Sequence, residues 1–185
     1  MNKKCILLIG GARSGKSRFA REFALKLGEP VLFVATATAE DEEMKQRIEE
    51  HRRARPATWD TLEVTTDIGS QILQKIGGAK VVIVDCITLW VNNIFNQYAD
   101  QANEPIDAST IEQKLTTEID ELVDCINRTE ANFIIVTNEV GLGLVPANRV
   151  GRLYRDLLGR VNQLLTERAD EVYLMLTGLP VQVKP

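Results

Sequence analysis

An octapeptide near the N-terminus constrains the fold of this chain more than any other feature. It matches the pattern G-x-x-x-x-G-K-S/T and reads Gly10-Gly11-Ala12-Arg13-Ser14-Gly15-Lys16-Ser17. In a chain of 185 residues this pattern arises by chance at a rate of roughly one in a hundred or less. A glycine-rich turn with a solvated lysine is the alternative interpretation.

The residues on both sides of the octapeptide favour a phosphate-binding loop. The apolar residues 6–9 precede it, and an amphipathic segment with Phe19, Phe23 and Leu27 follows it. Phosphate binding needs this strand, loop and helix, because glycines let backbone N–H groups surround the phosphates and the helix N-terminus adds its positive dipole end. In such a loop Lys16 reaches the β- and γ-phosphates and Ser17 ligates Mg²⁺. The octapeptide therefore predicts a nucleotide-binding protein.

Short apolar runs alternate with helix-length segments along the chain. The runs are residues 6–9, 31–34, 81–84, 133–136 and 172–176, and the predicted helices are 16–27, 41–53, 68–76, 111–127 and 150–168. Runs that are apolar at every position suit strands buried on both faces. We therefore expect an α/β fold whose mostly parallel sheet is flanked by helices. The polar segment 97–109 reads as a solvated connection, so residues 1–185 form a single domain.

The C-terminal residues predict an antiparallel hairpin. The turn signal Thr177-Gly178-Leu179-Pro180 separates the run 172–176 from the alternating residues 181–183. This hairpin places the C-terminus at one edge of the sheet.

Composition excludes several classes of protein. Lys and Arg number 22 against 26 Asp and Glu, so the net charge is −4, which argues against nucleic acid as the main partner. The 3 cysteines are widely spaced and there is 1 histidine, which supports neither a disulfide framework nor a structural zinc site. No apolar run reaches the roughly 18 residues of a membrane span. These features indicate a cytoplasmic, enzyme-sized domain.

Polar residues follow two of the predicted strands. Asp85 ends the run 81–84, and Asn138 and Glu139 follow the run 133–136. Nucleotide sites of parallel sheets lie at the carboxyl ends of the strands, so Asp85 is a candidate Mg²⁺ ligand. A helix cap at Asp85 and a polar loop start at Asn138 remain open as alternatives. The glycines at 141 and 143 suggest a mobile loop at the same edge.

The single histidine, His51, lies near the end of a basic predicted helix that Pro56 helps to stop. Arg47, His51 and Arg55 are spaced i, i+4, i+8 and therefore share one helix face. Two interpretations stay open. The face is either a solvated basic helix end, favoured by the helix dipole, or a phosphate-facing surface on which His51 is a nucleophile.

Several motifs together carry a resemblance to a known family, and they extend in order over essentially the whole chain. They are the octapeptide, Ala35-Thr36-Ala37, His51 with Arg55-Pro56, Trp59, Glu63, Thr137-Asn138-Glu139-Val140-Gly141, Val145-Pro146 and Val161-Asn162-Gln163. In these the chain resembles the bifunctional adenosylcobinamide kinase / adenosylcobinamide-phosphate guanylyltransferases of cobalamin biosynthesis. The resemblance implies a RecA-like P-loop fold and a homo-oligomer, namely a trimer.

The resemblance implies a reaction in two steps. ATP or GTP phosphorylates the aminopropanol hydroxyl of adenosylcobinamide, and GTP then transfers GMP to that phosphate, which releases pyrophosphate and gives adenosylcobinamide-GDP. The guanylyl group first goes onto a histidine. Relatives carry two adjacent histidines here, whereas this chain has Glu50 before His51, so the role falls on His51.

The resemblance also implies a set of nucleotide-contacting positions. Beyond Gly10, Gly11, Ala12, Arg13, Ser14, Gly15, Lys16 and Ser17, these are Ala35, Thr36, Ala37, Arg52, Arg53, Ala54, Arg55, Glu63 and Asp85. Asp85 stands where some relatives have Glu.

Two other functions remain as alternatives. A single-activity P-loop kinase of another small metabolite would need Lys16 and Asp85 but would have no covalent use for His51. A switch-type nucleotide-binding protein would act through a mobile loop. The absence of an N-K-x-D motif weakens a small-GTPase interpretation, and the chain length argues against a motor ATPase.

Overall fold

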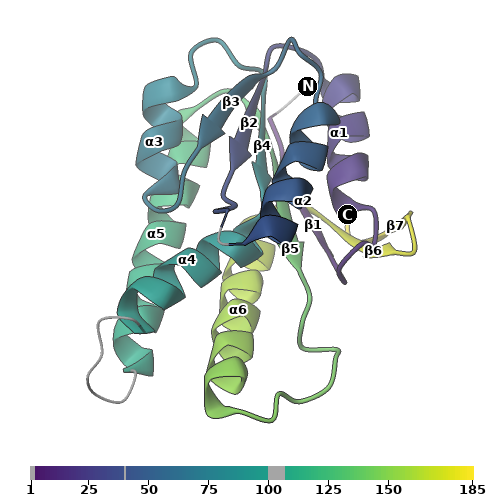
Figure 1. The fold of residues 1–185 in the computed structure, drawn as a ribbon. Coiled ribbons are helices and arrows are strands. Elements are labelled where there is room, and N and C mark those ends of the chain that lie inside the picture. The colour runs from purple at the N-terminus through teal and green to yellow at the C-terminus, as the bar shows by residue number, and fades with distance from the viewer. Residues whose placement is uncertain (1–2, 40, 100–106) are drawn as a thin grey trace.

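The computed structural model describes residues 3–39, 41–99 and 107–185, and a seven-stranded sheet forms its centre (Figure 1). The strands are β1 (Cys5–Gly10), β2 (Val31–Ala35), β3 (Asp60–Glu63), β4 (Val81–Asp85), β5 (Asn132–Asn138), β6 (Glu171–Leu176) and β7 (Leu179–Lys184). Their order is β3-β2-β4-β5-β1-β6-β7. All neighbouring pairs are parallel except β6 and β7. The prediction of a mostly parallel sheet is confirmed.

The predicted hairpin is also confirmed. β7 is the edge strand and runs antiparallel to β6, with Val181 opposite Leu174 and Leu179 opposite Leu176. The turn between them has positive φ angles at Thr177 (48°) and Gly178 (90°). This turn lies against the phosphate-binding loop, since the Gly178 N–H donates to the Ser14 carbonyl over 2.9 Å.

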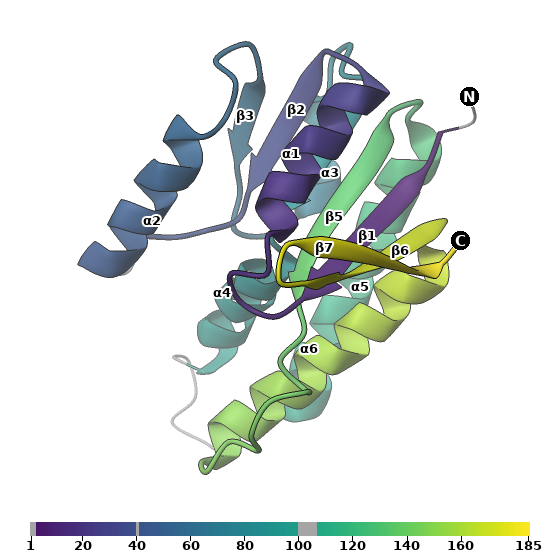
Figure 2. The ribbon, with the colours of Figure 1, turned by 90° about the vertical axis from the view of Figure 1, so that its right-hand side faces the viewer.

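Helices cover both faces of the sheet, as Figure 2 shows. They are α1 (Lys16–Leu27), α2 (Glu42–Arg53), α3 (Ile68–Lys75), α4 (Ile87–Ala99), α5 (Ala108–Arg128) and α6 (Arg149–Arg168). Because side chains alternate along a strand, Leu7 of β1 packs in the core with α3 to α6, whereas Ile6 and Leu8 pack in the core with α1. No helix in the described part of the chain is long and apolar enough to cross a membrane.

Two elements, β3 and α4, are not predicted from the sequence. β3 is an edge strand with one aliphatic side chain, Leu62, and three polar ones, so its residues give no apolar run. Helix α4 begins two residues after β4, so that strand and helix read as one continuous apolar stretch. The polar connection predicted for 97–109 is wrong at both ends, because 97–99 lie in α4 and 108–109 in α5, while 100–106 lie outside the described residues.

The three cysteines are unpaired and buried, in agreement with the prediction that they form no disulfide framework. Burial raises the pKa of Cys5 to about 12 and the pKa values of Cys86 and Cys125 to about 11. A thiol in this state is inaccessible and almost fully protonated near neutral pH.

We therefore expect the native protein to react with no equivalent of a disulfide reagent at about pH 8, and the denatured protein to react fully. Unfolded thiols ionise near pH 9.0, whereas the buried ones stay neutral to about 11, so stability is retained below pH 9.0 and declines as the pH rises through this interval. Absorbance of the released thiolate measures the first effect, and thermal melts across the pH series measure the second. Rapid reaction of a native thiol would contradict the expectation.

Candidate active site

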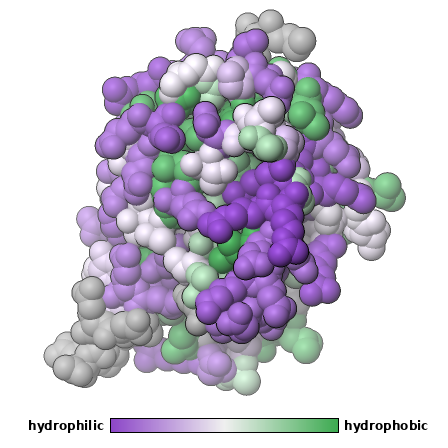
Figure 3. Space-filling model, turned by 45° about the horizontal axis from the view of Figure 1, so that its top comes forward, coloured by the Kyte–Doolittle hydropathy of each residue, from purple (hydrophilic) through white to green (hydrophobic). Residues whose placement is uncertain are grey.

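A cleft of about 910 Å³ lies at the carboxyl ends of the parallel strands. Its walls come from the phosphate-binding loop, from the ends of β2, β4 and β5, and from α2 with the residues after it. The space-filling view in Figure 3 shows strongly hydrophilic side chains on the face where α2 lies in Figure 1, with apolar atoms visible in hollows beside them. The carboxyl edge of the sheet is thus the place where the predicted functional residues meet.

The octapeptide forms the loop between β1 and α1, as predicted. Gly10 has a φ of 158°, and a Cβ there would meet the Met175 carbonyl of β6 at 2.6 Å. Gly15 has a φ of 93° and caps the N-terminus of α1 in the left-handed region. The backbone therefore turns sharply and packs closely at both ends of the loop, which side chains at these positions would prevent.

Lys16 lies inside this loop with only 6% of its surface exposed. Its Nζ donates to the carbonyls of Gly10 (3.0 Å) and Gly11 (2.7 Å) and to Ser14 Oγ (3.4 Å). Burial lowers the pKa of Lys16, and the charge of Asp85 opposes that effect. A phosphate entering the loop would supply the negative charge that this buried ammonium favours.

Asp85 ends β4 and lines the cleft. The next residue, Cys86, is held by Thr36, which directly follows β2: Thr36 Oγ1 donates to the Cys86 carbonyl (2.7 Å) and accepts from the Cys86 N–H (2.8 Å). Asp85 Oδ2 is buried and has no hydrogen-bond partner among the described residues. An unpartnered carboxylate oxygen in this position fits a cation.

A magnesium ion would find only part of its ligands here. No group of three or more His, Cys, Asp or Glu in the described part of the chain could hold a metal alone. Mg²⁺ commonly uses one or two protein oxygens together with substrate phosphates and waters. Ser17, which also lines the cleft, and Asp85 therefore fit this ion as partial ligands.

Helix α2 brings His51 to the cleft. Asp41 caps the helix, with its carboxylate accepting from the Met44 N–H at 2.7 Å, and none of the α2 side chains is buried. Arg47 and His51 line the cleft from α2, and Arg55 lines it from just past the end of the helix, so the predicted common helix face holds only for the first two. A helix with no buried side chain is held mainly at its ends, and here the last turn is tied to β3 by the ion pair between Arg52 and Glu63.

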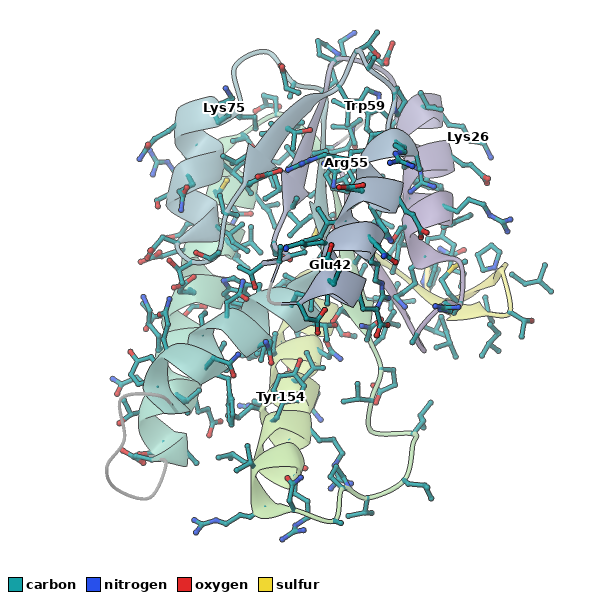
Figure 4. The ribbon with its side chains drawn as sticks, in the orientation of Figure 1. Lys26, Glu42, Arg55, Trp59, Lys75 and Tyr154 are labelled. Carbon is teal, nitrogen blue, oxygen red and sulfur yellow. The ribbon has the colours of Figure 1, made fainter. Side chains whose placement is uncertain are left out.

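Arg55 lies just past α2, against the sheet, as Figure 4 shows. Its guanidinium carbon is 3.8 Å from the centroid of the Phe33 ring. The Nε and Nη1 atoms are buried without hydrogen-bond partners among the described residues. Burial lowers the pKa of Arg55, and the charge of Asp85 opposes this. These unpartnered donors make Arg55 a strong candidate for binding an anion.

Most of the predicted site residues line the cleft, but some do not. Those that line it are Arg13, Ser14, Gly15, Lys16, Ser17, Ala35, Ala37, His51, Arg52, Ala54, Arg55, Glu63 and Asp85. Gly10, at the end of β1, and the exposed Gly11 and Ala12 do not line the cleft, and Thr36 is fully buried. Arg53 pairs over 3.2 Å with Glu49, which lines the cleft, but Arg53 does not line it.

Several further cleft residues are not predicted from the sequence, among them Arg18, Arg21, Phe33 and Cys86. Arg18 and Arg21 have the spacing of one helix face, but α1 alone does not indicate which face meets α2. Phe33 lies inside an apolar strand run, where its contact with a guanidinium gives no sequence signal. Asn138, which the sequence indicates only as a strand-end residue within a family motif, also lines the cleft.

The loop, the parallel sheet and the cleft at its carboxyl edge define a P-loop nucleotide-binding protein. The sequence profile of the family described as "Cobinamide kinase / cobinamide phosphate guanyltransferase" matches residues 6–183. This chain belongs to that family, so the resemblance drawn from the sequence is confirmed.

Curated relatives agree over nearly the full length. The chain is 41% identical over 180 residues to "Bifunctional adenosylcobalamin biosynthesis protein CobU" of Escherichia coli, covering 97% of this chain and 99% of that protein. It is 40% identical over 180 residues to the protein of the same name from Salmonella typhimurium, with 97% and 99% covered. It is 38% identical over 178 residues to "Bifunctional adenosylcobalamin biosynthesis protein CobP" of Pseudomonas aeruginosa, with 96% of each covered.

Proposed function

We propose that this chain phosphorylates adenosylcobinamide with ATP or GTP and then transfers GMP from GTP to the phosphate, giving adenosylcobinamide-GDP. The observation that carries this proposal is that Lys16 and His51 line one cleft, in a chain of the cobinamide kinase family. One site thus contains a triphosphate-binding loop for both steps and a nucleophile for the second.

In the kinase step, the loop residues and Lys16 hold the β- and γ-phosphates while the substrate hydroxyl attacks the γ-phosphorus. Lys16 is already buried and fixed, so it offers its charge without a large reorganisation. When bound by Ser17 and Asp85, Mg²⁺ would neutralise charge on the phosphates. Arg55 presents unpartnered donors to the same cleft and would bind developing negative charge.

In the guanylyl step, a ring nitrogen of His51 attacks the α-phosphorus of GTP. A P–N bond forms, the bond from the α-phosphorus to the bridging oxygen breaks, and pyrophosphate leaves with that electron pair. Arg47 and Arg55 line the cleft with His51 and would stabilise the phosphate charge. The phosphate of the corrinoid then displaces the imidazole, and GMP passes to the product.

The proposal includes a homo-oligomeric assembly and a cytoplasmic location for this chain. Large apolar side chains are strongly exposed on the loop after β5 (Leu142, 85%; Leu144, 96%) and on β7 (Leu179, 68%). Such surfaces support a homo-oligomer, for which the family resemblance implies a trimer. The unpaired cysteines support a cytoplasmic location.

Incubation with GTP labelled at the α-phosphate tests the function. The wild-type protein should retain labelled GMP after denaturation and should convert adenosylcobinamide to its phosphate and then to the GDP derivative. A metabolite kinase without guanylyl transfer would retain no label, and a switch-type protein would also leave adenosylcobinamide unchanged. Mass spectrometry of the corrinoid products distinguishes these outcomes.

A further inference from the structure

A buried hydrogen-bond network fixes the carboxyl end of β5. The Asn138 N–H donates to Thr88 Oγ1 (2.7 Å), and Asn162 Nδ2 donates to the Asn138 carbonyl (3.1 Å). Asn162 is held in turn by the Thr137 hydroxyl, which donates to Asn162 Oδ1 over 2.8 Å. The Tyr154 hydroxyl of α6, labelled in Figure 4, donates to the Thr88 carbonyl over 2.8 Å. Side chains from α4 and α6 thus hold both backbone polar groups of Asn138.

The network fixes the backbone of Asn138 but makes no hydrogen bond to its side chain. Asn138 lines the cleft, and within residues 3–39, 41–99 and 107–185 its carboxamide makes no hydrogen bond. Thr88, Thr137 and Asn162 are buried, at 8%, 0% and 5% exposure. A fixed backbone with a free polar side chain at a cleft wall is typical of a group that meets a ligand.

Asn138 lies between the two parts of the site that handle phosphate. In the sheet it is paired in register with Gly10, the first residue of the phosphate-binding loop. The Glu139 N–H also donates to the Gly10 carbonyl, over 3.0 Å. On its other side β5 borders β4, where Asp85 pairs with Val136, so Asn138 extends two residues beyond Asp85. Its carboxamide is therefore next to the space above the loop, on the side of Asp85.

We propose that Asn138 is a catalytic residue of the kinase step, which holds the γ-phosphate and the attacking hydroxyl together. This inference rests on the proposed function. The carboxamide Nδ2 donates to a γ-phosphate oxygen, while Oδ1 accepts from the hydroxyl of the corrinoid substrate. The hydroxyl oxygen forms the new bond to the γ-phosphorus, the bond from the γ-phosphorus to the bridging oxygen breaks, and the electron pair leaves with the nucleoside diphosphate. The hydroxyl proton passes to solvent, because a carboxamide cannot take it.

A carboxamide suits this position for two physical reasons. It presents a donor and an acceptor side by side in one plane, so one group orients both reactants. It is also neutral, so it does not repel the phosphates as a carboxylate would. The guanylyl step makes no such demand, because His51 attacks at the α-phosphorus and the γ-phosphate departs within pyrophosphate. Asn138 should therefore separate the two activities of the single cleft.

The test compares Asn138→Ala with Asn138→Asp, which has nearly the same shape but loses the donor and adds a negative charge. Asn132→Ala is the matched control, because it removes the same side chain at the opposite end of β5. For both Asn138 variants we expect kcat for adenosylcobinamide phosphorylation to fall about a hundredfold. KM for the nucleotide should change less than about threefold in Asn138→Ala and should rise in Asn138→Asp, whose carboxylate repels the phosphates. Labelling of the variants with GMP should stay within about threefold of wild type, and the control should keep both activities.

The possible results are distinct. A wild-type protein that does not phosphorylate adenosylcobinamide would overturn the proposed function, and this inference with it. An active wild type, with an Asn138→Ala kinase kcat within about threefold of it, would overturn this inference alone. Equal loss of both half-reactions in a folded variant would show a structural role and also overturn it. If Asn138→Ala fails to fold, Asn138→Asp gives the same comparison, with its GMP labelling as the measure of an intact site.

Discussion

Replacing Lys16 by alanine is expected to lower both adenosylcobinamide phosphorylation and guanylyl transfer by about a thousandfold or more. The two steps draw on one triphosphate-binding loop, and Lys16 is the buried cation at its centre. Without it, the phosphates would meet the carbonyls of Gly10 and Gly11 with no ammonium between them. Steady-state assays with each nucleotide, together with calorimetric titration of GTP, measure the losses of turnover and binding.

Two further variants test whether the loss of activity comes from the missing charge and from this position in α1. Lys16→Met keeps most of the side-chain volume while removing the charge, so it should lose activity to the same extent if charge is what matters. Lys26→Ala, in the exposed last turn of the same helix and away from the cleft (Figure 4), should keep both activities. Undiminished guanylyl transfer by the Lys16→Ala protein would mean that GTP binds elsewhere and would contradict a shared loop.

The central strands could be predicted because the side chains on both of their faces are buried. Each side chain of β2 is buried, and in β4 only the terminal Asp85 is not, so the sequence shows an unbroken apolar run. β3 gives no such signal, since it pairs only with β2 and places Leu62 alone against the core. Helix α4 carries a recognisable pattern at Ile87, Trp90, Val91, Ile94 and Phe95, but this pattern begins directly after a buried strand and merges with it.

The candidate site likewise has one part that could be predicted from the sequence and another that depends on the tertiary structure. The loop was predictable because its chemistry is local, with glycines, lysine and serine at fixed spacing in one octapeptide. Arg55 illustrates the other part. Its spacing from His51 predicts a shared face, but its stacking on Phe33 of β2 and its unpartnered nitrogens depend on how the chain folds back after α2. The network around Asn138 likewise joins residues from α4, β5 and α6 that no sequence pattern connects.

His51→Ala is expected to abolish GMP labelling and guanylyl transfer while leaving phosphorylation of adenosylcobinamide measurable. The kinase step needs in-line attack by a substrate hydroxyl and no enzyme nucleophile, so only the second step depends on the imidazole. In the reactive complex the attacking nitrogen must lie within roughly 3–3.5 Å of the α-phosphorus. Because α2 has no buried side chain, little packing opposes the movement that this approach requires.

The chemistry of the adduct identifies the nucleophile independently of the variant. Attack by His51 gives a phosphoramidate, whose P–N bond is cleaved readily in acid and survives alkali, whereas an acyl phosphate on Glu or Asp is destroyed by alkali. The labelled wild-type protein should therefore lose its GMP in acid and retain it in alkali, as followed by filter binding after each treatment. Glu42→Ala, on the same helix but outside the cleft, serves as the control and should label normally. Label retained by the His51→Ala protein, or an alkali-labile adduct on the wild type, would contradict attack by His51 and would mean that another residue carries the GMP.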